Sequence, residues 1–101
     1  MNSLGAELRD AVAQDVRLDD DLLTVDIADG RTLSVPIVWF LRLSHATPAE
    51  RSKRQLIGPG TGIHWPDLDE DISVRSILAG QPSAESQESL QRWLSQRDIS
   101  A

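Results

Sequence analysis

Alternation of apolar and polar residues predicts a β-hairpin in the first third of the chain. The apolar positions are Leu23, Val25 and Ile27 in one stretch and Leu33 and Val35 in the next. A period of two gives each strand one face that can be buried. Asp29-Gly30 lies between the stretches and can adopt the positive φ angles that a two-residue type I′ turn needs. We therefore expect a hairpin closed at Asp29-Gly30, preceded by an extended segment over residues 13–17.

Helical segments are predicted on both sides of Thr47. Apolar residues are densest over residues 37–43, directly after Pro36, which suits the first position of a helix. We expect a short helix there, buried on most sides. Thr47-Pro48-Ala49-Glu50 places an N-cap, a helix-starting proline and a capping-box glutamate at the required spacing. A helix from Pro48 to about Leu56 should follow, and the glycines of residues 58–62 should end it.

The pattern then predicts one strand and one more helix. Ile63-His64-Trp65 is short and bulky, as strands are, and the acids of residues 67–71 should lie in a surface loop. Ser73 can cap a helix over residues 74–79, which Gly80 ends.

The last twenty residues predict a helix with a narrow apolar stripe. Ser83 can cap it, and Leu90, Trp93 and Leu94 recur at helical spacing among polar residues. Trp is enriched among the residues that dominate interfaces, so we expect this helix to serve self-association or partner binding. Packing on its own domain is the alternative. Residues 1–11 form a separate segment whose apolar spacing predicts a short helix.

Composition indicates one small acidic domain. Its 101 residues can build one modest core, and 40% hydrophobic with 26% charged residues is an ordinary globular balance. There is no cysteine, which excludes disulfides, thiolate metal sites and thiol nucleophiles. No signal peptide or membrane span is recognisable, so we expect a cytoplasmic protein without a membrane partner.

The formal charge of −6 works against binding to nucleic acid. Four of the ten basic residues nevertheless lie close together in the sequence: Arg42, Arg51, Lys53 and Arg54. The first interpretation is the solvated side of a helix. The alternative is a small patch that binds an anion or an acidic partner.

The sequence contains parts of three motifs for ligand binding or catalysis, and each of them is incomplete. The glycine-rich residues 58–62 lack the following Lys-Ser or Lys-Thr of a phosphate loop, so a loop with unusual φ angles is favoured. Asp67, Asp69 and Asp71 alternate as in a calcium loop, but that loop's glycine and bidentate glutamate are missing. His64 near Asp67, Asp69 and Glu70 suggests an acid/base pair or a metal site, yet two histidines and no cysteine give few ligands. We assign no catalytic residue, metal ligand or cofactor.

The order of several short segments resembles a bacterial family of unknown function, DUF2442. The matching segments are Leu23-Thr24-Val25, Asp29-Gly30-Arg31, Val35-Pro36-Ile37-Val38-Trp39-Phe40, Arg42-Leu43, Ala46-Thr47-Pro48-Ala49-Glu50-Arg51, Gly62-Ile63-His64-Trp65 and Leu68-Asp69-Glu70-Asp71-Ile72. The resemblance covers about residues 12–80. It implies a small α+β domain, and it implies that some members are antitoxin-like partners of a toxin encoded beside them.

The resemblance transfers no catalytic residue to this chain. Leu41 stands where the family often has proline, and Lys53-Arg54 where an aromatic-containing pair is common. Some members carry an added helix-turn-helix domain. Here the residues after Gly80 supply only one helix, whereas a helix-turn-helix domain needs at least two. We therefore do not expect an added DNA-binding domain of this kind.

These observations predict an α+β fold: a small antiparallel sheet built on the hairpin, covered by short helices, with a C-terminal amphipathic helix. The domain should span residues 12–80 and the helix residues 81–101. The expected core residues are Ile27, Val35, Val38, Phe40, Leu43, Ile63 and Ile72. The candidate ligand or partner surface comprises His64, Trp65, Asp67, Asp69, Glu70, Asp71, Arg42, Arg51 and Trp93.

The expected function is a non-enzymatic protein-interaction module, the antitoxin-like partner of a neighbouring toxin. One alternative is a ligand-binding or enzymatic domain that uses the segment from His64 to Asp71. Another is a dimeric transcriptional regulator, which the negative charge disfavours.

Overall fold

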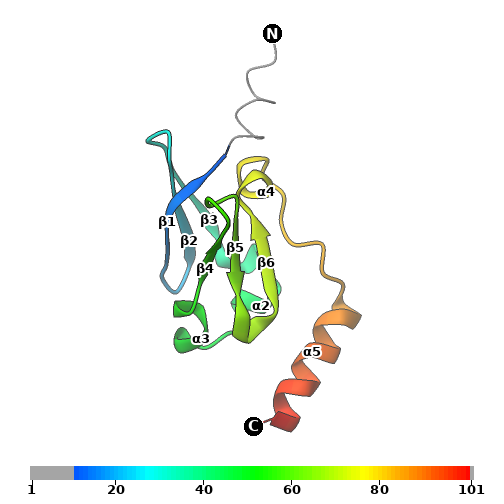
Figure 1. The fold of residues 1–101 in the computed structure, drawn as a ribbon. Coiled ribbons are helices and arrows are strands. Elements are labelled where there is room, and N and C mark those ends of the chain that lie inside the picture. The colour runs from blue at the N-terminus through cyan, green and yellow to red at the C-terminus, as the bar shows by residue number, and fades with distance from the viewer. Residues whose placement is uncertain (1–10, 101) are drawn as a thin grey trace.

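Two three-stranded antiparallel sheets form the body of the protein in the computed structural model, which describes residues 11–100, with side chains to residue 97. The first sheet has the order β1 (Ala13–Leu18), β2 (Leu22–Ile27), β3 (Thr32–Pro36). The second has the order β4 (Gln55–Ile57), β5 (Gly62–Trp65), β6 (Glu70–Ser73). Figure 1 shows β4 and β6 on the two sides of β5.

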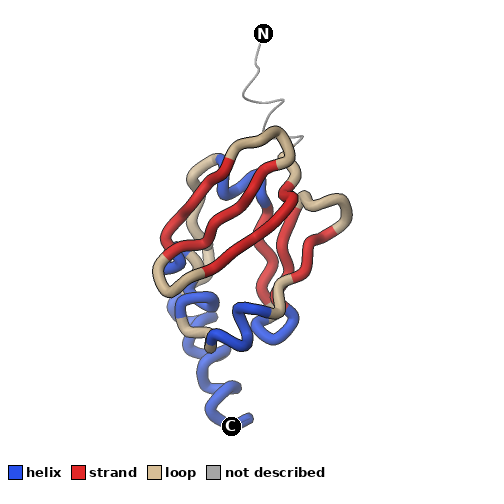
Figure 2. Tube along the Cα trace, turned by 90° about the vertical axis from the view of Figure 1, so that its left-hand side faces the viewer, coloured by secondary structure: helices blue, strands red, loops and turns tan. Residues whose placement is uncertain are grey.

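Several short helices and one longer helix complete the α+β fold that the sequence predicts. They are η1 (Ile37–Trp39), α2 (Leu41–Ser44), α3 (Pro48–Ser52), η2 (Pro66–Leu68), α4 (Val74–Leu78) and α5 (Gln87–Ser100). Figure 2 shows most of them near one end of the strands, with α5 continuing from that end to the C-terminus. None of the helices in the described part of the chain has the length and apolar character of a membrane span.

One hydrophobic core joins both sheets with the helices α2, α4 and α5. Six predicted core residues are buried: Ile27, Val35, Phe40, Leu43, Ile63 and Ile72. The prediction for Val38 is wrong, because its side chain is 68% exposed. Residues 37–43 do not form one helix. The single 3₁₀ turn of η1 buries Ile37 and leaves Val38 on the outside, and α2 begins only at Leu41.

The hairpin of β2 and β3 is confirmed, but its turn differs from the one predicted. Gly30 N–H donates to the Ile27 carbonyl at 3.0 Å, and Ile27 N–H donates to the Arg31 carbonyl at 2.7 Å. The loop therefore has three residues, with positive φ at Gly30 (101°) and not at Asp29. Such a loop combines a type I turn with a glycine bulge. Asp29 instead accepts a hydrogen bond from the Arg31 N–H.

The capping box at Thr47 is confirmed, but the helix that it begins is shorter than predicted. The Thr47 hydroxyl accepts from the Glu50 N–H, and the Glu50 carboxylate accepts from the Thr47 N–H. Helix α3 ends at Ser52, and residues 55–57 form strand β4 by pairing with residues 62–64 of β5. Pairing with β5 thus overrides the helical continuation to Leu56.

The two later helices also have serine caps. The Ser73 hydroxyl caps α4 as predicted, by accepting from the Ser76 N–H at 3.0 Å. Residues 70–73 form strand β6 because they pair with β5, so the loop predicted for the acids of residues 67–71 is wrong at Glu70 and Asp71. Helix α5 begins after Ser86, whose hydroxyl accepts from the Ser89 N–H, so the predicted cap at Ser83 is wrong.

Helix α5 packs on its own domain, which is the alternative that the sequence left open. Leu90 is 3% exposed and Trp93 is 9% exposed, and both belong to the common core. Residues 79–86 form the linker between α4 and α5. A hydrogen bond from the Ser83 N–H to the Trp39 carbonyl, at 2.9 Å, holds this linker against η1. The helix predicted within residues 1–11 lies almost wholly outside the described residues.

Candidate functional site

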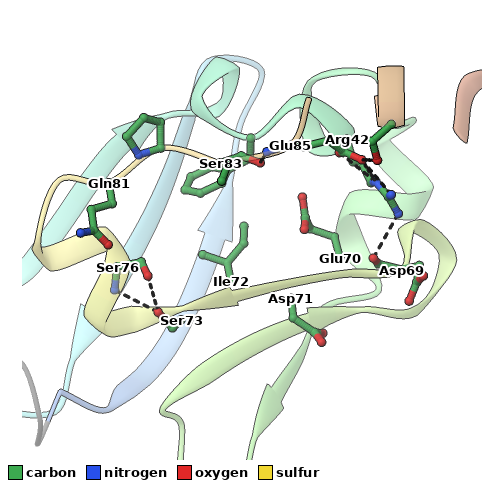
Figure 3. A pocket seen from close by; sticks show the side chains of 14 residues that line it. Arg42, Asp69, Glu70, Asp71, Ile72, Ser73, Ser76, Gln81, Ser83 and Glu85 are labelled. Carbon is green, nitrogen blue, oxygen red and sulfur yellow. Dashed lines mark hydrogen bonds and ion pairs between the residues drawn. The ribbon is translucent and has the colours of Figure 1, made fainter. Parts of the chain in front are cut away.

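Arg42 connects α2, η2 and the linker. Its Nε donates to both carboxylate oxygens of Glu85, at 2.9 and 3.0 Å, and its Nη2 donates to Oε2 at 2.8 Å. Its Nη1 donates to the carbonyls of Leu68 and Asp69 at 3.0 and 3.2 Å. Figure 3 shows this group at one end of a pocket. The sequence singled out Arg42 and Asp69 but not Glu85, whose partner lies 43 residues away.

Two guanidinium groups lie close to the ring of Trp93. The Cζ atoms of Arg42 and Arg97 lie 5.3 and 4.5 Å from the ring centroid, within the range of cation–π contacts. Arg97 also donates to the Glu50 carboxylate at 2.6 and 2.7 Å. These hydrogen bonds lower the pKa of Glu50 to about 2. The Trp93 ring, which the sequence assigned to an interface, thus contacts Arg42 of α2, and the ion pair between Arg97 and Glu50 joins α5 to α3.

A cleft of about 480 Å³ opens between β6 and the linker. Arg42 and Glu85 line one end, Ser73 and Ser76 the other, and Phe40, Ile72 and Pro82 add apolar surface. Figure 3 shows Glu70 and Ile72 pointing from β6 into this space. Oε2 of Glu70 is buried and has no hydrogen-bond partner among the described residues, and burial raises the pKa of Glu70. The cleft therefore holds one unpaired carboxylate oxygen.

His64 and Asp71 form a second pair; Asp71 is among the residues that line the cleft, and His64 is not. They are opposite each other in the β5–β6 register, and His64 Nδ1 is hydrogen-bonded to Asp71 Oδ1. Figure 3 shows the Asp71 side chain pointing away from Glu70. Nearby, Asp67 pairs with Lys53 at 3.0 Å. Asp67 and Asp71 thus have different partners, and within residues 11–97 no three His, Asp or Glu side chains converge as metal ligands would.

Trp65 is not a surface residue, which corrects its place in the candidate surface. Its side chain is fully buried, and its Nε1 donates to the Arg51 carbonyl at 3.0 Å. The alternation of β5 explains this, because Ile63 and Trp65 face the core while His64 faces outward.

The four neighbouring basic residues do not form one solvated helix side. Arg42 binds Glu85 and Lys53 binds Asp67. Arg51 donates to the carbonyls of Leu43 and Ser44, and Arg54 donates to those of Val16 and Ser52. Two of the four are therefore neutralised by acids, and two are held by neutral carbonyl groups.

Strand β4 is a feature that the sequence interpretation missed. It is the edge of its sheet, and all three of its residues are exposed. Leu56 is 42% exposed and Ile57 is 41% exposed. The signal was Leu56-Ile57 directly before the glycine-rich segment, which is typical of a strand ahead of a turn. That segment is the β4–β5 turn, where a Cβ at Gly60 would lie 2.3 Å from the Ala13 carbonyl oxygen.

Comparison with known proteins places this fold in a described family. Residues 13–83 match the family described as "Protein of unknown function (DUF2442)". The chain belongs to this family. The resemblance seen in the sequence is thereby confirmed, and helix α5 lies beyond the matched region.

Two solved structures are similar to this chain. A crystal structure of a protein of unknown function from Rhodospirillum rubrum is 26% identical, with a TM-score of 0.67, and covers 77% of this chain and 96% of its own. A solution NMR structure of an uncharacterized protein from Chromobacterium violaceum is 16% identical, with a TM-score of 0.63, and covers 100% and 94%. The second likeness shows the fold alone. No curated protein matches the sequence.

Proposed function

We propose that this DUF2442 chain is a protein-interaction module that binds an extended segment of its partner along strand β4. By analogy with the antitoxin-like role that the resemblance implies, the proposed partner is a toxin encoded beside it. The observation that carries the proposal is the exposure of Leu56 and Ile57 on an edge strand. An edge strand offers unpaired backbone groups, and exposed apolar side chains add area to bury.

The other three sheet edges carry features that oppose strand pairing. On β1, the Val16 carbonyl already accepts a hydrogen bond from Arg54 Nε. Strand β3 ends in Pro36, which has no N–H to donate. Strand β6 directs the charged Glu70 inward and faces the linker across the cleft. Such features are recognised ways of protecting an edge. Strand β4 instead carries two adjacent exposed aliphatic side chains.

Strand addition at β4 makes a quantitative prediction. Burial of one Leu or Ile side chain stabilises a complex by up to about 1.5–3 kcal/mol, and about 1.4 kcal/mol changes Kd tenfold. Because β4 has only three residues, few main-chain hydrogen bonds can form. Leu56 and Ile57 should therefore supply a large part of the affinity.

The test compares two lysine variants in titration calorimetry with the purified product of the neighbouring gene. Leu56→Lys should weaken binding at least about tenfold, because it puts a charge where an apolar side chain would be buried. Val38→Lys is the matched control, since Val38 is also an exposed aliphatic residue but lies on η1. Equal affinity of both variants and the unchanged chain would refute binding at β4. Absence of binding by the unchanged chain would refute this partner.

A second candidate function is the binding of a small organic cation in the cleft. The specific observation in its favour is the buried, unpaired Oε2 of Glu70. A buried carboxylate oxygen without a donor is costly, and an ammonium group would supply one. The test is an NMR titration with n-butylammonium. The signals of Ile72 and Ser83 should shift in the unchanged chain and stay in place in the Glu70→Gln variant. Shifts of equal size in the variant would exclude this site.

A further inference from the structure

A second hollow, of about 240 Å³, lies where the end of β1 meets α3. Its charged lining residues are Arg17, Arg51, Arg54, Asp19 and Asp20. Three positive charges thus face two negative ones, in a chain whose formal charge is −6. Two of the four neighbouring basic residues of the sequence, Arg51 and Arg54, meet at this hollow, together with Arg17 from β1.

Arg51 and Arg54 keep their charge available for a ligand. Arg51 donates to the Leu43 carbonyl at 2.9 Å through Nε and to the Ser44 carbonyl at 3.3 Å through Nη2. Arg54 donates through Nε and Nη1 to two further carbonyls. A guanidinium has five N–H donors, so each keeps others free. Among the described residues, no carboxylate lies within ion-pair distance of either side chain.

The acids and Arg17 in this hollow have different surroundings. Asp19 accepts the backbone N–H groups of Asp21 and Leu22 at 2.8 and 2.7 Å, so its carboxylate caps its own turn. Arg17 is paired with Asp26. Asp20 is exposed at the hollow. Arg51 and Arg54 are therefore held in place by carbonyls, and Asp19 and Asp20 are the negative charges that oppose an incoming anion.

We propose that Arg51 and Arg54 bind a carboxylate of an acidic side chain on the segment that pairs with β4. The inference rests on the proposed function, because Arg54, which lines the hollow, directly precedes the first residue of β4 in the chain. Guanidinium forks match the two oxygens of a carboxylate. The volume is below the range of about 300–1,000 Å³ for small-molecule pockets, which favours a side-chain group over a larger free ligand.

The experiment titrates the full chain with a synthetic peptide, acetyl-Ile-Asp-Val-Glu-Val-amide, and with its Asn/Gln counterpart. NMR follows the Arg Nε–H signals and the β4 amides. The acidic peptide should shift Arg51 and Arg54 and bind at least about fivefold more tightly than the neutral one. Asp20→Asn should tighten binding of the acidic peptide about threefold, and Arg54→Gln should weaken it about tenfold. Arg54→Lys, which keeps the charge but loses the fork, should fall between.

The outcomes separate this inference from the proposed function. Equal binding of both peptides with protection of β4 would overturn the carboxylate site and leave strand addition standing. Shifts at the arginines without change at β4 would support the site and refute strand addition. Inorganic phosphate that binds Arg51 and Arg54 more tightly than the acidic peptide would overturn the assignment in favour of a free anion.

Discussion

Removal of the Trp93 side chain tests whether α5 belongs to the core of this protein. Trp93 is 9% exposed, and two guanidinium groups lie within cation–π distance of its ring. A buried tryptophan removes about 150–250 Å² from water, which at about 25 cal/mol per Å² corresponds to about 4–6 kcal/mol as an upper bound. Trp→Ala substitutions in cores cost about 3–5 kcal/mol. Because α5 is also held by Leu90 and Arg97, we expect Trp93→Ala to cost about 3 kcal/mol.

The assay is thermal and urea unfolding followed by circular dichroism. In a domain of this size, 1 kcal/mol shifts Tm by about 4–8 °C, so Trp93→Ala should lower Tm by at least about 10 °C. Arg92→Ala is the matched control on the same helix. Its ion pair with Glu88 is an exposed i,i+4 contact, and such a pair contributes about 0.3–0.5 kcal/mol.

Sedimentation of the same variants gives the refuting result. If Trp93→Ala keeps the Tm of the unchanged chain but lowers its mass in solution, Trp93 belongs to an interface between chains. The packing of α5 on its own domain would then be wrong. A lower Tm with unchanged mass supports it.

Three further predictions follow from particular contacts. Gly30→Val should lower the unfolding free energy by about 1–2 kcal/mol in urea titrations, because a β-branched residue is strained at a φ of 101°. No atom lies within 4 Å of the new Cβ, so the cost comes from the backbone and not from a clash. An unchanged unfolding midpoint would contradict this strain. The pKa of Glu50 is lowered to about 2 from 4.5, so its contribution to stability is present above pH 4.5 and is lost as pH falls towards 2. The difference in unfolding free energy between the unchanged chain and Glu50→Gln should therefore shrink over that pH range. A constant difference would contradict the ion pair with Arg97. The chain should bind random duplex DNA poorly at physiological salt in gel shifts, and tight, steeply salt-dependent binding would revive the regulator alternative.

Local signals in the sequence were sufficient for the hairpin, the Thr47 capping box and the Ser73 cap. In each case the deciding atoms lie within a few residues of one another. Six core residues also followed from periodicity. Prediction went wrong where a distant partner decides the structure. Residues 55–57 are a strand only because β5 pairs with them, and Val38 is exposed because η1 is a single turn.

The candidate surface was predicted less well than the fold. Sequence proximity grouped His64 with Asp67, Asp69 and Glu70, whereas His64 pairs with Asp71 across β5 and β6 and Asp67 pairs with Lys53. Arg42 meets Glu85 from 43 residues away, a contact that no local pattern encodes. The gathering of Arg17 with Arg51 and Arg54 likewise depends on how the two sheets meet.

Amide hydrogen exchange tests the central claim most directly, because it locates the binding surface residue by residue in the full chain. The chain would be compared alone and with a saturating amount of the neighbouring gene's product. Strand addition predicts slower exchange at residues 55–57 on binding, with little change in α5. Protection confined to the cleft residues Glu70, Ile72 and Ser83, with β4 unchanged, would contradict the account.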